Sequence, residues 1–207
     1  MKLKKKVKRL LILFLLIIVI IVGGLWFFLG RKEEKQPQTT TVVETLDNYG
    51  YSLRSNATSL SKSLFEELKK VLNQEPINEE EYAKLVARSF LADFYTLDNK
   101  VTNNDIGGVQ YVYSSVQDNF ILKAQDTLYK YVESNLYDER EQELPIVTAV
   151  EVTSITSTTY TLGEVTDDKA YQVEATITYQ KDLGYDSSRK LIIMHDENDH
   201  LSIVEIS

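Results

Sequence analysis

The chain contains no cysteine and two histidines among its 207 residues. The absence of cysteine excludes disulfide bonds, thiolate catalysis, cysteine-ligated zinc and lipid attachment through a lipobox cysteine. No glycine-rich phosphate loop and no Gly-x-Ser-x-Gly nucleophile motif occurs, although serine and threonine are plentiful. A folded part of this chain must therefore be held together by its core alone.

Metal ligands are also scarce. His195 and His200 flank one short turn, and two histidines are too few for a zinc site unless Asp196 or Asp199 completes it. The segment 103–114 has the alternate spacing of a calcium loop, but a serine stands where the bidentate glutamate is required. We therefore expect no metal site and no cofactor.

Basic residues are rare beyond position 32. Residues 1–32 carry eight of the 23 basic residues and none of the 31 acidic ones, so residues 33–207 have a net charge of 15 − 31 = −16. So acidic a segment repels both nucleic acid and an anionic lipid surface. We expect no nucleic-acid partner.

One long apolar run interrupts this polar composition. Residues 10–29 are twenty consecutive uncharged residues, seventeen of them Leu, Ile, Val or Phe. A helix of this length reaches about 30 Å, the thickness of the bilayer core, whereas the apolar part of a signal peptide is about 7 to 15 residues long. The run predicts a transmembrane helix inserted in the lipid bilayer, with a cleaved export signal as the alternative.

The charges beside the run predict its direction. Residues 1–9 contain six basic residues and no acid, which by the positive-inside rule keeps the N-terminus in the cytoplasm and exports the rest. We expect a single-pass cell-membrane protein of a bacterial envelope of the Gram-positive type. Its predicted parts are a basic tail (1–9), the anchor (10–29), a linker that includes the start of the first helix (30–52) and an extracytoplasmic domain (53–207).

Three helices are predicted in the exported part. Apolar residues from position 42 to 71 recur at steps of three and four, which predicts one amphipathic helix that either self-associates as a stalk or packs on the protein's own sheet. Asn78 and Glu81 form a capping box for a second helix that ends near Leu97. Turn-forming residues fill 98–108, and a third helical region is predicted over 116–132.

Beyond Pro145 the chain is rich in Val, Ile, Thr and Tyr. Residues 146–162, 170–181, 189–195 and 201–207 are separated by turn segments and predict four antiparallel strands. In the second strand, apolar and polar residues alternate, so one face of the sheet is buried. The predicted fold class is α+β, with about three helices packed on a curved four-stranded antiparallel sheet, behind an N-terminal transmembrane helix.

Three helices followed by a four-stranded meander resemble the nuclear transport factor two-like superfamily, also called SnoaL-like or cystatin-like. Residues 90–113, FLADFYTLDNKVTNNDIGGVQYVY, carry most of the likeness, which covers roughly residues 55–207. Within that superfamily the chain is similar to the bitopic scaffold proteins of type IV secretion and Gram-positive conjugation systems. The resemblance implies a cone-like domain whose interior holds a ligand, transfers protons or is filled by side chains.

Five residues are candidates for a pocket or an interface. Asp93, Tyr95 and His195 are those to inspect for proton transfer, because such a site needs an ionisable group among apolar neighbours. Tyr95, Tyr111 and Tyr113 are candidates for a tyrosine cluster that lines a cavity or a protein interface. No catalytic set emerges from the sequence.

The sequence therefore favours a non-enzymatic module that associates with other proteins or with itself, as an accessory or scaffold component of a bacterial envelope or conjugation machine. The alternative is an extracytoplasmic domain that binds a small ligand, or a proton-transfer enzyme that uses the cone.

Overall fold

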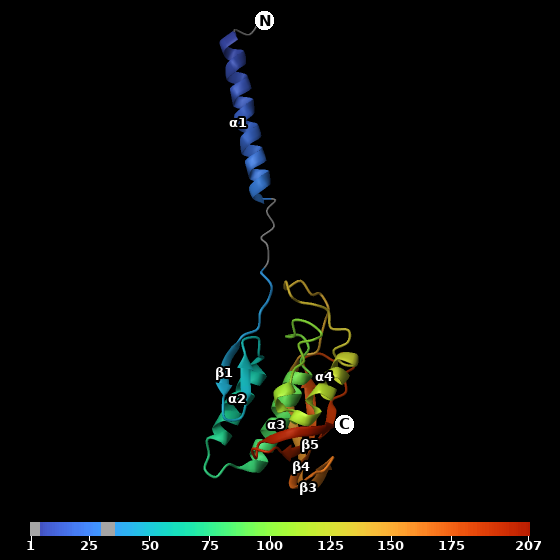
Figure 1. Ribbon diagram of the computed structural model, residues 1–207. Coiled ribbons are helices and arrows are strands. Elements are labelled where there is room, and N and C mark those ends of the chain that lie inside the picture. Colours follow the sequence, from blue (N-terminus) through green and yellow to red (C-terminus); the bar gives the residue numbers. More distant parts are fainter. Residues whose placement is uncertain (1–4, 30–35) are drawn as a thin grey trace. The chain divides into compact units, whose positions relative to one another are not determined.

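The computed structural model describes residues 5–29 and 36–207. The chain divides into two compact units, Met1–Gln36 and Pro37–Ser207. The described part of the first unit is mainly the helix α1, Lys5–Leu29 (Figure 1). Among the described residues, no helix meets the combined length and apolarity needed to cross a membrane. The predicted basic tail and linker lie partly outside the described residues.

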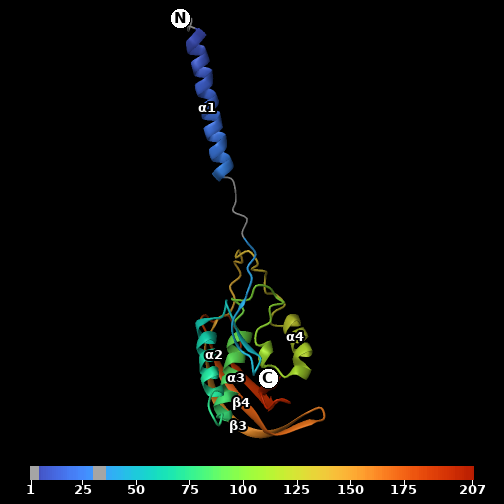
Figure 2. The same ribbon diagram turned by 60° about the vertical axis from the view of Figure 1, so that its left-hand side comes forward.

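The second unit contains the predicted sheet. Its strands are β3 (Val147–Leu162), β4 (Val165–Tyr179), β5 (Ser188–His195) and β6 (Leu201–Ile206), antiparallel in the order β3-β4-β5-β6. The long β3–β4 hairpin stands out at one edge (Figure 2). The predicted alternation on β4 is confirmed, because Val173, Ala175 and Ile177 are buried whereas Thr176 and Thr178 are exposed.

The central helix is α3, Glu79–Phe94, which contacts β3, β4 and β6. The predicted cap is confirmed, since the Asn78 side chain accepts a hydrogen bond from the backbone N–H of Glu81. The helix α2, Ser59–Leu72, packs on α3. Its N-cap is Thr58, whose hydroxyl accepts a hydrogen bond from the backbone N–H of Ser61. These helices cover one face of the sheet.

The prediction of a single helix over 42–71 is wrong for its first half. Residues 42–54 form a hairpin of β1 (Val42–Leu46) and β2 (Tyr51–Arg54). The reason is the turn between them, where Gly50 has a φ of +69°, a conformation that ends helical structure and favours glycine. The buried residues of α2 are Leu64, Phe65, Leu68 and Leu72, and they pack within the domain, mainly against α3. Of the two alternatives for this stripe, the structure shows packing within the protein's own fold.

The third predicted helix is shorter than expected. Two single turns, η1 (Val109–Tyr111) and η2 (Ser114–Val116), precede α4, Gln117–Asp126. The helix ends at Thr127, which leaves the helical region with φ −121° and ψ −97°. The unit thus has an α+β fold in which α2, α3 and α4 accompany a four-stranded antiparallel sheet.

Candidate functional site

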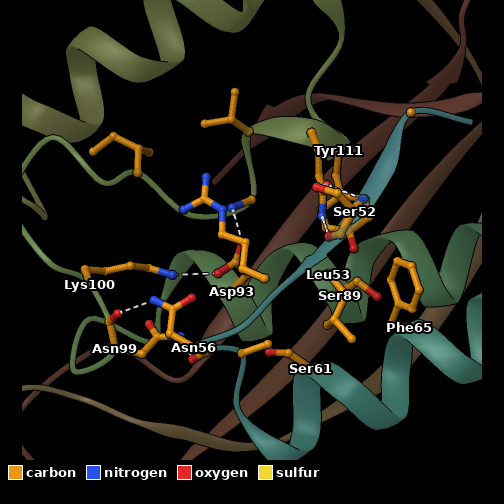
Figure 3. A pocket seen from close by; sticks show the side chains of 17 residues that line it. Ser52, Leu53, Asn56, Ser61, Phe65, Ser89, Asp93, Asn99, Lys100 and Tyr111 are labelled. Atoms are coloured by element: carbon orange, nitrogen blue, oxygen red, sulfur yellow. Dashed lines mark hydrogen bonds and ion pairs between the residues drawn. The ribbon is translucent and has the colours of Figure 1, made fainter. Parts of the chain in front are cut away.

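A pocket of about 300 Å³ lies beside α3, on the side of the β1–β2 hairpin. Its wall is formed by residues 50–57 of the hairpin and the following loop, the start of α2, the last two turns of α3 and the loop 99–111 (Figure 3). None of its lining residues belongs to β3, β4, β5 or β6. The pocket therefore lies outside the space between helices and sheet in which the sequence predicted one.

An ion pair forms one wall of this pocket. The Lys100 ammonium lies 2.6 Å from the Asp93 carboxylate, and the Lys100 side chain is only 2% exposed. The second Asp93 oxygen accepts the backbone N–H of Gly108 at 2.7 Å. Removal from water alone would raise the Asp93 pKa, but Lys100 and the Gly108 N–H together hold it below its ordinary value. The carboxylate is therefore ionised at neutral pH.

The loop 98–108 is tied closely to the end of α3. A Cβ atom at Gly107 would lie 2.4 Å from the carbonyl oxygen of Asp93, so only glycine fits there. The backbone N–H of Gly107 donates to the hydroxyl of buried Tyr129 at 3.0 Å, and that hydroxyl donates to the carbonyl of Phe94 at 2.7 Å. These contacts place Lys100 opposite Asp93.

The hairpin wall is held by side chains that bind backbone groups. The side-chain amide of Gln110 accepts a hydrogen bond from the backbone N–H of Ser52 at 2.8 Å and donates one to the backbone carbonyl of Ser52 at 3.1 Å. The backbone of a neighbouring strand would make the same pair of bonds. Asn56 and Asn99 each donate a side-chain N–H to the other's carbonyl, at 2.7 and 3.1 Å. The pocket walls are therefore fixed by hydrogen bonds between segments far apart in the sequence.

Arg54 and Asp105 add a second ion pair on the more exposed side of the pocket. Their side chains approach to 2.5 Å, and the same carboxylate accepts the backbone N–H of Val101 at 3.1 Å. The two cations that line the pocket, Arg54 and Lys100, are thus each matched by a carboxylate.

The amide oxygen of Asn99 is a buried atom at the pocket that has no hydrogen-bond partner among the described residues. The hydroxyl of Ser89, a residue that is 5% exposed, interacts with the hydroxyl of buried Tyr111. This interaction lowers the pKa of Tyr111, although burial dominates and raises that pKa. Buried polar groups are normally paired, so the Asn99 oxygen is an exception.

The other candidate residues lie elsewhere. His195 ends β5, as predicted, and its Nε2 is 3.9 Å from the carboxylate of Glu79, the first residue of α3. Asp93 is in the last turn of α3, roughly 20 Å away at 1.5 Å per residue. The structure therefore does not bring Asp93 and His195 into one site.

His195 has a partner of its own. Its Nδ1 lies 2.9 Å from the Asp167 carboxylate, which also accepts the backbone N–H of His195 at 2.8 Å. Partial burial would raise the Asp167 pKa, but these bonds hold it below its ordinary value. This pair ties the start of β4 to the end of β5.

The three tyrosine candidates do not form one cluster. The Tyr95 hydroxyl accepts a hydrogen bond from Nε of Arg189, a residue of β5, at 2.5 Å. The backbone N–H of Tyr113 donates a hydrogen bond to the carbonyl oxygen of Ile203, a residue of β6. Tyr111 alone lines the pocket, with its ring 5.0 Å from that of Tyr51. Of the five candidates, Asp93 and Tyr111 are thus brought together at one pocket.

The chemistry available there favours binding over proton transfer. A carboxylate with a lowered pKa is a poor general base near neutral pH, and a buried tyrosine with a raised pKa is a poor acid. Within the described part of the chain, no three His, Cys, Asp or Glu residues are grouped so that they could hold a metal ion.

Sequence reasoning missed Ser89, Asn99 and Lys100. Ser89 lies among apolar residues of a helix, and Asn99 and Lys100 lie in the segment 98–108 of turn-forming residues, so none of them carries a local signal of a site. A signal was available in the consecutive glycines 107 and 108, since such a pair indicates close backbone approach.

Comparison with known protein families, curated proteins and solved structures finds no match to this chain. Its function must therefore be inferred from its own residues and geometry.

Proposed function

We propose that this protein is a membrane-anchored extracytoplasmic module that works by protein association, as an accessory or scaffold component of a bacterial envelope or conjugation machine. The observation that carries the proposal is an apolar run of twenty residues in front of a folded, acidic unit. A tether and a separate folded unit are what such a module requires.

The membrane anchor rests on residues 10–29. The side chains of residues 13–22 are all apolar and belong to one helix, α1. A continuous apolar surface of this kind is unfavourable in water and favourable in a bilayer. The basic residues before it then favour a cytoplasmic N-terminus and an exported domain.

The association role rests on the domain itself. Its order of helices followed by a four-stranded meander supports the proposed likeness to the nuclear transport factor two-like scaffolds of conjugation systems. The Lys100–Asp93 ion pair and the hydrogen bonds of Gln110 and Tyr129 connect parts of the fold to each other, as in a structural module.

The second candidate is a domain that binds a small ligand. The pocket beside α3 favours it, because its size is at the lower end of ligand pockets, about 300 to 1,000 Å³. The lowered pKa of Asp93 makes it a poor general base, so ligand binding is better supported at this pocket than a proton-transfer reaction.

The absence of cysteine allows a direct test of the anchor. Lys2→Cys and Ser207→Cys each place one thiol at an end of the chain. In intact cells, a membrane-impermeant maleimide is expected to label Ser207→Cys only, whereas Lys2→Cys reacts after lysis. Labelling of both ends in intact cells, or release of the domain into the medium, contradicts the proposed topology.

The association role is tested by amine crosslinking in intact cells. The full chain is expected to form one recurrent larger species, either with itself or with an envelope protein. The control replaces residues 10–29 by an unrelated transmembrane segment, and the species should persist because the exported domain carries the contact. Monomer alone in both proteins contradicts the role.

A further inference from the structure

We propose that the outer edge of β3 pairs with the same edge of a second copy of this chain, so that their two sheets join into one. This inference rests on the proposed function, since it names the surface and the partner through which the module associates. It is carried by a strand edge that is uncovered, uncharged and able to pair with itself.

The two edges of the sheet differ in what covers them. The order β3-β4-β5-β6 makes β3 and β6 the edge strands. The edge of β6 is occupied, because the carbonyl of Ile203 accepts the backbone N–H of Tyr113 at 2.9 Å. Arg88 binds the carbonyl of Val150 near the start of β3, but no described residue outside the sheet hydrogen-bonds the backbone of residues 151–162. The second half of β3 therefore has an uncovered edge.

The backbone groups of Ile155 and Ser157 point to this edge. On β4, the backbone N–H of Ile177 donates at 2.7 Å to the residue that precedes β5, and alternate residues of a strand face the same neighbour. Tyr171 and Val173 therefore also face β5. Their partners across the β3–β4 ladder are Ser157 and Ile155, so these two residues direct N–H and C=O away from the sheet.

This part of β3 lacks the features that protect an exposed edge. Residues 152–162, VTSITSTTYTL, contain no charged residue and no proline, although residues 33–207 have a net charge of −16. Natural sheets commonly place lysine, other charges or proline on such an edge, which prevents a further strand from pairing there. The edge is therefore open to another strand, and it has no charge with which to select an oppositely charged partner.

The regular part of this edge is residues 154–158, because irregularities interrupt the β3–β4 pairing on both sides of them. A two-fold axis at Thr156 sets Ile155 opposite Ser157 of the second copy. The outward N–H and C=O groups of these residues then hydrogen-bond across the axis, as in an antiparallel ladder. The same stretch of the two copies thus supplies both sides of the contact.

Charge does not oppose this contact locally. The register sets Glu151, the one charged residue of β3, opposite Thr161 of the second copy, so no like charges meet. The rest of the domain is acidic and repels another copy at long range, and salt screens this repulsion. Pairing should therefore strengthen as the salt concentration rises. Anchors in the same membrane raise the effective concentration of the copies, which favours a contact of this limited size.

The test uses single cysteines, because the natural chain has none. Thr156→Cys in the full chain, in isolated membranes under mild oxidation, is expected to form a disulfide-linked dimer. Facing residues of a non-hydrogen-bonded pair have Cα atoms about 4.5 Å apart, which is within disulfide range. Thr176→Cys, exposed on the inner strand β4, is the matched control and should give at least about tenfold less dimer.

A second variant tests the backbone pairing itself. Ser157→Pro removes an N–H that points away from β4, so the sheet keeps its own hydrogen bonds whereas the second copy loses a donor. Added to Thr156→Cys, it should lower the dimer yield at least about tenfold with little change in melting temperature, and Thr176→Ala should leave the yield unchanged. Where the proline variant does not fold, Ser157→Glu serves instead, because it keeps the N–H and places acids on both sides of the axis.

The results separate this proposal from the association role. An amine-crosslinked species without a Thr156→Cys dimer means that association uses another surface, and it overturns the edge pairing alone. Absence of both species overturns the edge pairing and the association role together. A dimer yield that is equal in Thr176→Cys, unchanged by both substitutions at Ser157, or lower at high salt also contradicts the edge pairing.

Discussion

The two sides of α3 face different surroundings. Ala83, Ala87 and Leu91 are spaced by four, are fully buried and lie on the helix side opposite Ser89, and α3 contacts three strands of the sheet. On the other side, Ser89 and Asp93 are also spaced by four, but they border a hollow and carry polar groups.

The two sides of α3 therefore separate the apolar packing that stabilises the fold from the polar groups that characterise a binding site. The apolar side holds α3 on the sheet by close packing, which requires no polar group. The polar side holds a buried ammonium and a buried hydroxyl, features that destabilise a fold unless something compensates them. Lys100 is compensated by Asp93, and the Ser89 hydroxyl interacts with the Tyr111 hydroxyl.

The largest effect is expected from Asp93→Ala. It leaves the Lys100 ammonium buried without an anion, so the free energy of unfolding should fall by about 3 to 5 kcal/mol in urea denaturation. The double variant Asp93→Leu/Lys100→Met should recover most of this loss. Glu81→Ala removes one of the two exposed carboxylates that pair with Lys84, and should change the free energy of unfolding by at most about 0.5 kcal/mol. Equal losses in the two single variants contradict a buried charge pair.

The next largest loss of stability is expected when the hydrogen bonds of the Tyr129 hydroxyl, which hold the loop 98–108 to the end of α3, are removed. Tyr129→Phe leaves the Gly107 N–H and the Phe94 carbonyl without this partner, and should lower the free energy of unfolding by about 1 to 3 kcal/mol. Tyr131→Phe is the control, because Tyr131 is 75% exposed, and it should change the value by at most about 0.5 kcal/mol. Similar values for both tyrosines would show that the loop is held in another way.

The ion pair also predicts a dependence on pH. The pKa of Asp93 in the folded chain is below its ordinary value, so its contribution to stability is complete above the unfolded-state pKa of about 3.9 and is lost as the pH falls through the folded-state pKa. The unfolding free energy of the natural chain should therefore fall more steeply below about pH 4 than that of Asp93→Leu/Lys100→Met. Parallel curves contradict the assigned pair.

The smallest effect is expected from Ser89→Ala. The change removes a buried hydroxyl that interacts with the neutral Tyr111 hydroxyl, so the free energy of unfolding should fall by at most about 1 kcal/mol. Thr58→Ala removes a hydroxyl that caps α2, and should lower the free energy of unfolding by about 0.5 to 2 kcal/mol. A loss in Ser89→Ala larger than in Thr58→Ala would contradict this ranking.

The sequence predicted those elements whose signals are local. The Asn78 cap marked the start of α3, and the alternation around Val173 marked a strand with one buried face; both are confirmed. The hairpin of β1 and β2 was missed because its apolar residues also fit a helical period, and that period does not reveal the turn at Gly50.

The pocket was beyond prediction for a different reason. Its walls come from residues 50–65, 89–93 and 99–111, which no local pattern connects. Asp93 was singled out from its apolar neighbours, but its pairing with Lys100 depends on a loop whose path is set by Gly107, Gly108 and Tyr129. Tertiary contacts of this kind determine the site.

The contrast between the two sides of α3 is tested most directly by one pair of enlarging substitutions, Ala87→Leu and Ser89→Leu, measured by urea denaturation. Ala87→Leu adds volume to the packed side and should lower the free energy of unfolding by about 1 to 3 kcal/mol. Ser89→Leu adds volume beside a hollow of about 300 Å³, and its loss should be at most about 1 kcal/mol. An equal or larger loss in Ser89→Leu would contradict the account.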